Sequence, residues 1–565
     1  MKQAIKLVNE YGFELNVKKT KKDEKTYIKD DTLYYRTIPE GLLCLLNGQP
    51  LKETPFKQTS TMIDLSRNQV FKLAYFKEVL VKHALLGFDE VWLYLEDTYE
   101  VKQHPKFGYM RGRYSKEELL ALNAFANKLG ITLVPCIQTL GHMAQFLKWF
   151  SSAPYKDTFD ILKVDSDKTY ELINNMIKTL KETFNTTKIH VGMDEAFGLG
   201  FGRYYKENGY KNQPELFMEH LIKVNDICLA NGFKDVYIWS DMFFRMYSKT
   251  ESYYDPTITF DTSYTSRIPE NVGLVYWDYY NSDKTLIKGM LARHLELNRK
   301  VIVASGTWVW TKLYYDKTQT DKTALPLIEA CQALGIEEIN FTQWQDDGAY
   351  CLYDSIYLGL YDVANKIYGD TLNKSVFETI SKMDYHLAVK NSQISYLGFA
   401  PINLLWDDII LGIYVNERFG YDYEQIDTVL NNIEAYLQEA LSDYVQLLVK
   451  LFHNKLKIRR TLLYNYQHKQ SLKAVFPLLV DFDSLSQEVL TTIKTRWLKN
   501  NKIFGLEVLE SRLEVYKSRS YNLRYLINEY ENNKLDKLDF LEQPLLKEPY
   551  LSPKFSDMFY GTKVF

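Results

Sequence analysis

Between Thr61 and about Asn365 the chain alternates short apolar runs with amphipathic stretches, and this pattern restricts the fold more than any other feature. Eight runs have the character of buried parallel strands: Thr61–Leu65, Glu90–Leu95, Thr132–Ile137, Lys188–Gly192, Asp235–Ser240, Leu274–Trp277, Val301–Ser305 and Ile339–Trp344. Helical stretches lie between them, for example Phe71–Leu86, Lys116–Leu129, Tyr170–Thr183 and Pro214–Ala230. Glycines follow three of these as predicted C-cap residues: Gly87, Gly130 and Gly232. Eight strands alternating with helices predict an α/β fold, a closed (β/α)₈ TIM barrel with its chemistry at the carboxyl ends of the strands.

The segments on either side of the barrel differ from it in pattern. Residues 1–58 contain the short β-like runs Leu33–Tyr35 and Leu42–Leu46 and predict a small N-terminal α+β domain before a barrel at residues 59–370. Residues 371–565 predict a C-terminal α-helical domain. One helix face there has apolar residues at helical spacing: Ile426, Val429, Leu430, Ile433, Leu437, Ala440 and Leu441. We expect this face either to pack against the barrel or to form a homodimer interface.

Composition excludes several classes of partner. The 69 basic and 72 acidic residues give a net charge of -3, so we expect no nucleic-acid partner. No run of about 18 apolar residues is present, so we expect no membrane span. The N-terminal segment lacks the continuous apolar core of a secretory signal, and the five cysteines are odd in number and widely spaced. A cytoplasmic protein with reduced cysteines is therefore expected.

The segment KIHVGMDEAFGLG places two acids, Asp194 and Glu195, directly after a predicted strand. Hydrolysis of an acetal requires a carboxylic acid that protonates the leaving oxygen and a second group that stabilises the positively charged transition state. Adjacent carboxylates raise each other's pKa, which helps keep one of them protonated. The alternative is a solvated acidic turn at the start of a helix.

The motif HVGMDE resembles the HxGGDE signature of glycoside hydrolase family 20, the β-N-acetylhexosaminidases, with Met193 in place of the second glycine. The resemblance covers roughly residues 60 to 350 and is strongest to the bacterial intracellular branch. It implies that Glu195 is the general acid/base and that Asp194 holds the 2-acetamido group of the substrate. The acetamido oxygen then attacks the anomeric carbon to form an oxazolinium intermediate, and the configuration is retained.

Further segments resemble this family in the same order along the chain. MIDLSRNQV matches the first-strand segment, which implies that Arg67 binds hydroxyls of the terminal sugar. VWLYLEDTYE matches the second and implies Asp97, although Glu96 beside it competes for the assignment. VPCIQTLGHMAQFLKW implies that His142 hydrogen-bonds the catalytic pair, whereas the position of His190 inside a strand favours a structural role.

Aromatic residues follow the later strands. Tryptophans of family members surround the acetamido methyl group and stack under the sugar, which implies pocket residues Trp239, Trp277, Trp308 and Trp344. Trp310 would share a side with Trp308 if that strand continued through Val309. FTQWQDDGAY implies that Asp346 binds the outer hydroxyls, and its short side chain leaves the choice between GlcNAc and GalNAc open. Three tyrosines compete to hold the acetamido oxygen, with Tyr279 preferred over the others: Tyr264 and Tyr315.

Two other functions remain open at this point. One is a retaining β-glycosidase in which a carboxylate attacks the sugar directly, and the other is a barrel that binds glycans without hydrolysing them. No cofactor and no metal are expected, because neither clustered His and Cys ligands nor a glycine-rich phosphate loop is found.

Overall fold

The computed structural model describes residues 1–543, 547 and 554–562. The chain forms two compact units. The first contains residues 1–307, 318–344 and 359–382, and the second contains residues 308–317, 345–358 and 383–565. The three-part division predicted at residues 58 and 370 stays a prediction, because these units follow the chain in an interleaved order.

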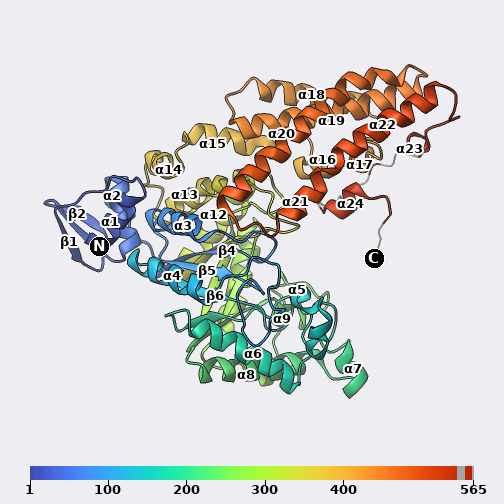
Figure 1. Ribbon diagram of the computed structural model, residues 1–565. Helices are drawn as coiled ribbons and strands as arrows, with labels where there is room; N and C mark the ends of the chain where they lie inside the picture. The colour runs from blue at the N-terminus through green and yellow to red at the C-terminus, as the bar shows by residue number, and fades with distance from the viewer. Residues whose placement is uncertain (544–546, 548–553, 563–565) are drawn as a thin grey trace. The chain divides into compact units, whose positions relative to one another are not determined.

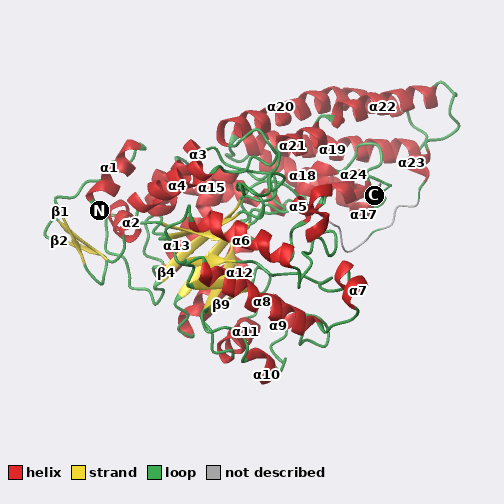
Figure 2. Ribbon diagram, turned by 60° about the horizontal axis from the view of Figure 1, so that its bottom comes forward, coloured by secondary structure: helices red, strands yellow, loops and turns green. Residues whose placement is uncertain are grey.

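The first unit contains a closed barrel of eight parallel strands, shown as yellow arrows in Figure 2. The strands are β4 (Gln58–Asp64), β5 (Glu90–Tyr94), β6 (Thr132–Cys136), β7 (Lys188–His190), β8 (Asp235–Trp239), β9 (Val272–Trp277), β10 (Val301–Gly306) and β11 (Glu338–Gln343). Each pairs with the next along the chain, and β11 pairs with β4 to close the ring. The predicted (β/α)₈ barrel is therefore confirmed, strand by strand.

Helices connect the strands of the barrel, as Figure 1 shows for α3, α4, α6 and α8. Their bounds are α3 (Leu73–Leu85), α4 (Lys116–Lys128), α5 (Ala144–Leu147), η1 (Phe150–Tyr155), α6 (Asp167–Lys181), α7 (Arg203–Asn208), α8 (Gln213–Ala230), α9 (Asp241–Arg245), α10 (Thr262–Thr265), α11 (Lys284–Glu296) and α12 (Lys317–Ala333). After the last strand, β11, come η2 (Tyr353–Ser355), α13 (Ile356–Ile367) and α14 (Lys374–Ser381). The predicted C-cap glycines Gly87, Gly130 and Gly232 have φ of 84°, 75° and 89°, a left-handed conformation that glycine adopts without strain.

The N-terminal segment is α+β, as predicted, but one of its two β-like runs is a helix. The elements are α1 (Lys2–Glu10), β1 (Lys19–Lys22), β2 (Tyr27–Lys29), β3 (Thr32–Tyr35) and α2 (Ile38–Asn47). The prediction of β structure at Leu42–Leu46 is wrong, because this run lies inside α2. The hydroxyl of Thr37 accepts the backbone N–H of Glu40 at 3.3 Å, and Gly48 ends the helix with φ of 69°.

The second unit is helical, and its longest helices run side by side (Figure 1). Its elements from residue 383 onward are α15 (Tyr385–Ser392), η3 (Gln393–Tyr396), α16 (Pro401–Trp406), α17 (Ile413–Phe419), α18 (Tyr423–Leu437), α19 (Asp443–Gln467), η4 (Leu472–Val475), α20 (Phe476–Asn500), α21 (Leu506–Leu513), α22 (Val515–Glu531), α23 (Asp539–Glu542) and α24 (Phe555–Phe559). The predicted apolar face is buried in α18 at Ile426, Val429, Leu430 and Ile433. Since α18 packs on α19 of the same unit, this part of the face is covered within the chain.

All five cysteines are buried and unpaired, as expected of reduced core residues. Among the described residues, no helix combines the length and the hydropathy needed to cross a membrane.

Candidate active site

Five polar residues follow four consecutive strands of the barrel. Glu96 comes directly after β5, His142 after β6, the pair Asp194 and Glu195 after β7, and Asp241 after β8. Because all the strands are parallel, these residues emerge at the same end of the barrel.

Asp194 and Glu195 meet at the imidazole of His142. The His142 Nε2 atom lies 3.1 Å from Asp194 Oδ2 and 3.5 Å from Glu195 Oε2. The other oxygen of Asp194 accepts a hydrogen bond of 2.8 Å from Gln138 Nε2. Both oxygens of Asp194 are thus engaged, whereas the Glu195 side chain is 40% exposed. The two adjacent acids therefore have different environments.

These contacts also shift the ionisation of the pair. Burial opposes the charged form of His142, but the negative charge and hydrogen bond of Asp194 outweigh it and raise the pKa to about 9. Burial likewise opposes ionisation of Asp194, yet His142 and Gln138 hold the pKa of that carboxyl below its usual value. At neutral pH the site therefore contains an imidazolium beside the carboxylate of Asp194.

This pair makes a testable contribution to stability. Since the pKa of His142 rises from 6.5 to about 9 on folding, the contribution is complete below pH 6.5 and is lost as the pH rises through the folded pKa. We expect the melting temperature of the wild type to fall more steeply between about pH 7 and pH 10 than that of His142→Gln, which cannot ionise. Thermal unfolding over a pH series measures both slopes.

A matched control is His453→Gln. His453 contacts Glu434 at 2.8 Å, but burial lowers its pKa, so its replacement should leave the alkaline slope unchanged. Parallel pH curves for the wild type and His142→Gln would contradict the predicted coupling.

A chain of hydrogen bonds connects Asp194 with Arg67. Gln138 Nε2 donates to the hydroxyl of Tyr94 at 2.9 Å, and that hydroxyl donates to Glu96 Oε1 at 3.2 Å. The same Glu96 oxygen accepts Arg67 Nη1 at 2.9 Å. Arg67 is thus fixed by Glu96 at one end of a network that reaches Asp194 at the other.

The predicted Asp97 has a different environment from its neighbour Glu96. Asp97 Oδ1 pairs with Arg111 Nε at 3.1 Å, and Arg111 Nη1 donates to the backbone oxygen of Arg67 at 2.7 Å. Glu96, by contrast, lies in the network itself. The structure therefore connects Glu96 with Asp194, whereas the role predicted for Asp97 stays a prediction.

The backbone around the acids is in an uncommon conformation. Met193, Glu195, His142 and Glu96 have φ of 72°, 48°, 54° and 44°, in the left-handed region that non-glycine residues rarely adopt. Met193 therefore holds a conformation that a glycine would adopt freely. A Cβ on the preceding Gly192 would lie 2.0 Å from Gln138 Oε1, so glycine is required where this side chain approaches the loop.

Asp241 supports the backbone at Glu195, and the sequence analysis did not single it out. Asp241 Oδ2 accepts the backbone N–H of Glu195 at 3.1 Å and lies 3.5 Å from Arg245 Nε. Burial and the nearby charge of Asp194 raise its pKa to about 7. Its position just after β8 was the available signal, because acids at strand exits face the site.

Aromatic rings pack beside the hydrogen-bond network that includes Tyr94. Trp344 meets the ring of Tyr94 edge to face at 4.8 Å, and Trp239 lies 6.0 Å from Trp344. Trp277 stacks on Tyr279 at 5.4 Å, and burial raises the pKa of Tyr279, so its hydroxyl stays neutral. These four predicted residues all belong to the first unit.

Tyr264 and His190 were the alternatives to Tyr279 and His142, and their contacts differ from those of the two preferred residues. Tyr264 packs against Phe243, with ring centroids 6.2 Å apart. His190 Nδ1 accepts the N–H of Gly192 at 3.1 Å, and burial lowers its pKa to about 3. A neutral, buried His190 matches the structural role predicted for it.

The remaining predicted residues, Trp308 and Asp346, belong to the second unit, as does Tyr315. Because β10 ends at Gly306, Trp308 and Trp310 do not share a side through strand alternation. Their rings nevertheless stack with centroids 4.0 Å apart. The roles of Trp308 and Asp346 stay predictions.

Across residues 1–543, 547 and 554–562, no group of three or more His, Cys, Asp or Glu side chains is arranged to hold a metal ion.

Known proteins similar to this chain point to one family. The hexosaminidase D of Bos taurus is 24% identical over 216 residues, 37% of this chain and 59% of that protein. The human hexosaminidase D is 23% identical over 239 residues, 40% of this chain and 46% of that protein. The match therefore spans about half the length of these relatives.

Two solved structures are similar over longer stretches. The chitobiase of Flavobacterium johnsoniae is 15% identical and aligns over 87% of this chain and 86% of its own, with a TM-score of 0.48. The family 20 exo-β-N-acetylglucosaminidase of Vibrio harveyi, solved with N-acetylglucosamine, is 13% identical over 69% of this chain and 72% of its own, with a TM-score of 0.48.

Family models match most of the sequence. The model for the glycosyl hydrolase family 20 catalytic domain matches residues 93–347, and that for the glycoside hydrolase 20C C-terminal domain matches residues 329–555. Together they match residues 93–555, and the chain belongs to glycoside hydrolase family 20.

Proposed function

We propose that the protein is an exo-acting, retaining β-N-acetylhexosaminidase that releases terminal β-linked GlcNAc or GalNAc from glycans. The observation that carries this proposal is the unequal pair at His142. Both oxygens of Asp194 accept hydrogen bonds, whereas the Glu195 side chain is 40% exposed.

The first step follows from these environments. Glu195 gives its proton to the glycosidic oxygen as the bond to the anomeric carbon breaks. The carbonyl oxygen of the substrate's acetamido group attacks that carbon, and the ring that forms is a positively charged oxazolinium ion. Asp194 accepts the acetamido N–H and stabilises this charge, for which its lowered pKa keeps it ionised.

The second step reverses the roles. Glu195, now a carboxylate, removes a proton from water, and the water oxygen attacks the anomeric carbon and reopens the ring. Two inversions at one carbon restore the β configuration.

The other predicted residues bind the sugar in this proposal. Arg67 and Asp346 hold hydroxyls, and Tyr279 donates to the acetamido oxygen. Asp97 acts through Arg111, which it pairs with at 3.1 Å. The tryptophans enclose the acetamido methyl group and the sugar ring: Trp239, Trp277, Trp308 and Trp344.

We also propose a cytoplasmic location, supported by five buried, unpaired cysteines. The net charge of -3 supports a neutral glycan rather than a nucleic acid as the partner. Homodimer formation remains part of the proposal and is measured by the mass of the protein in solution.

The test compares aryl β-GlcNAc, aryl β-GalNAc and aryl β-glucoside with purified protein. We expect cleavage of the acetamido sugars only, with the β-anomer as the first product by NMR. Efficient cleavage of the glucoside would replace the proposal with a direct carboxylate nucleophile. Binding of GlcNAc without turnover of any substrate would indicate a glycan-binding barrel.

A further inference from the structure

Two loops that leave the barrel belong to the second unit. Residues 308–317 come after β10 and residues 345–358 after β11, and both group with residues 383–565 rather than with the strands. These loops carry two of the sugar-binding residues of the proposed function, Trp308 and Asp346. The helices of the second unit can therefore act on the sugar through these loops.

Asp346 lies in a tight turn. The backbone N–H of Gly348 donates to the carbonyl of Gln345 at 3.0 Å, so Asp346 and Asp347 are the two central residues of a four-residue turn. Asp347 has φ of 57°, in the left-handed region where a side chain costs conformational energy. Such a residue keeps its conformation only where its surroundings hold it. The direction of Asp346 therefore depends on the contacts of Asp347.

Arg512 on α21 holds Asp347 by both its backbone and its carboxylate. Arg512 Nη1 donates to the backbone oxygen of Asp347 at 2.6 Å, and Nη1 and Nη2 lie 3.3 Å and 3.2 Å from the two carboxylate oxygens. One of these oxygens also accepts the backbone N–H of Phe555, the first residue of α24, at 3.0 Å. The planar fork of an arginine fits a carboxylate in this way, whereas a lysine offers only a point charge.

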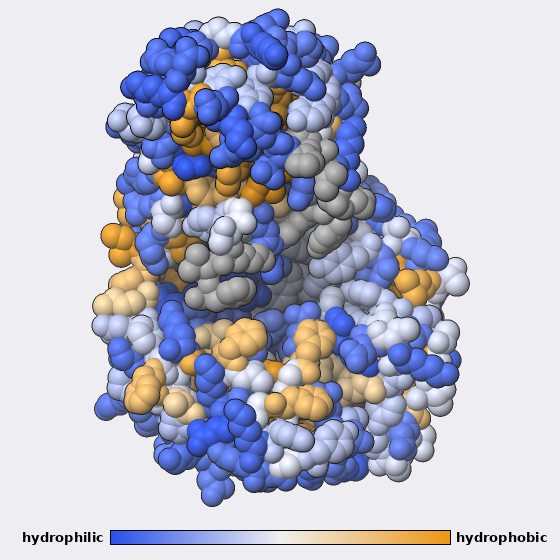
Figure 3. Space-filling view, turned by 90° about the vertical axis from the view of Figure 1, so that its right-hand side faces the viewer, coloured by the Kyte–Doolittle hydropathy of each residue, from blue (hydrophilic) through white to orange (hydrophobic). Residues whose placement is uncertain are grey.

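Aromatic rings hold the guanidinium of Arg512 in turn. Its Cζ atom lies 5.5 Å from the ring of Trp406 on α16 and 5.0 Å from the ring of Phe555. The same Trp406 ring meets Tyr350, in the loop after β11, edge to face at 5.5 Å. Figure 3 shows mainly hydrophilic side chains on the surface of the helices at the top of the view. By contrast, the side chains of Arg512 and Asp347 are only 15% and 17% exposed, so solvent screens their ion pair weakly.

Arg512 also balances the charge of the two acids in the turn. Burial and the charges of Asp347 and Asp346 raise the pKa of Tyr350, whereas the charge of Arg512 lowers it. The three charged groups thus act on one hydroxyl and lie near one another. Without the guanidinium, the carboxylates of Asp346 and Asp347 would repel each other with no cation between them.

We propose that Arg512 is a positioning residue for Asp346, and that the second unit thereby sets the affinity for the hydroxyls of the terminal sugar. The inference rests on the proposed function and gives the helices of the second unit a part in substrate recognition. A side chain as short as that of Asp346 reaches a hydroxyl only when its backbone is held in place, and Arg512 holds the peptide that follows it.

The test is a double-mutant cycle with Arg512→Lys, Asp346→Asn and the double variant, measured as kcat/KM on aryl β-GlcNAc. We expect Arg512→Lys to lower kcat/KM roughly tenfold, mainly through KM, and to have little further effect once Asp346 is replaced. A residue that only stabilises the fold would lower activity by the same factor in both backgrounds. If Arg512→Lys does not unfold cooperatively on heating, Asp347→Asn takes its place in the cycle.

Arg519→Lys is the matched control. Arg519 on α22 pairs with both oxygens of the buried Asp408 at 2.6 Å and 2.9 Å, and this acid lies outside the loop after β11. The control removes a similar fork from the same unit, so it should lower stability without coupling to Asp346→Asn.

Each outcome separates the positioning role from the proposed function. Independent effects of Arg512→Lys and Asp346→Asn, or no effect of Arg512→Lys, would overturn the positioning role and leave the hydrolase intact. If the wild type cleaves no substrate, the proposed function fails, and calorimetric titration of the same variants with GlcNAc then decides. Coupled losses of affinity would support the positioning role, and independent losses or undetectable binding to the wild type would overturn it.

Discussion

Glu195→Gln is expected to lower kcat/KM roughly 10²- to 10⁴-fold on substrates whose leaving group is a sugar, because the amide cannot give a proton to the glycosidic oxygen. The loss should be much smaller in the first step for a nitrophenyl leaving group, which departs as a stable anion. The measurement compares the two kinds of substrate under pre-steady-state conditions. This dependence on the leaving group distinguishes an acid from a residue that only shapes the site.

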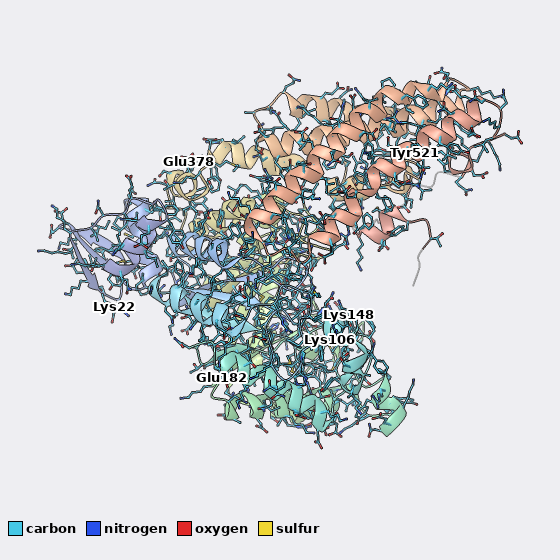
Figure 4. The ribbon with its side chains drawn as sticks, viewed as in Figure 1. Lys22, Lys106, Lys148, Glu182, Glu378 and Tyr521 are labelled. Carbon is cyan, nitrogen blue, oxygen red and sulfur yellow. The ribbon has the colours of Figure 1, made fainter. Side chains whose placement is uncertain are left out.

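Glu182→Gln is a matched control for this variant. The Glu182 side chain is 45% exposed, close to the 40% of Glu195, and it pairs with Lys116 on the surface (Figure 4). Its activity should equal that of the wild type. An equal loss in Glu195→Gln on both kinds of leaving group would contradict the assignment of general acid.

The barrel could be predicted strand by strand because its signal is local. A buried parallel strand is a short apolar run, and the helices between the strands repeat at a different period. The run Leu42–Leu46 was assigned wrongly because five apolar residues fit a strand or a helix equally well. Thr37 caps the start of this helix and Gly48 ends it, and both favour the helix over a strand.

The site was predictable where a residue follows a strand and carries reactive chemistry. His142, Asp194 and Glu195 meet these conditions, and the structure brings their side chains within 3.5 Å. Gln138 and Tyr94 do not meet both conditions. They matter because Gln138 hydrogen-bonds Tyr94 and Asp194, which follow or lie in other strands, and the spacing of residues in the sequence does not reveal such contacts.

The ambiguity between Glu96 and Asp97 has a similar cause. The two acids are adjacent, and the sequence gives no measure of which one turns toward His142. The left-handed conformation of Glu96 directs it to Arg67 and Tyr94, and Asp97 then pairs with Arg111.

Asp194→Asn is expected to lower kcat roughly 10²- to 10³-fold on every acetamido substrate, because a neutral amide cannot stabilise the oxazolinium charge. Since Asp194 acts on the acetamido group and not on the departing oxygen, the loss should be the same for nitrophenyl and sugar leaving groups. The substitution also removes the main cause of the raised pKa of His142. The alkaline fall in melting temperature should therefore weaken in this variant as it does in His142→Gln.

Asp408→Asn provides the comparison for a buried, paired carboxylate that belongs to the second unit. Asp408 is 1% exposed and pairs with Arg519 at 2.6 Å, so its loss should lower stability while kcat is retained. A dependence of Asp194→Asn on the leaving group would assign proton donation to Asp194 instead. If Asp194→Asn loses activity equally on all acetamido sugars and the loss in Glu195→Gln depends on the leaving group, the two adjacent acids have separate roles. Glu195 then transfers the proton, and Asp194 stabilises the oxazolinium charge. Their unequal hydrogen bonding to His142 and Gln138 indicates the same division.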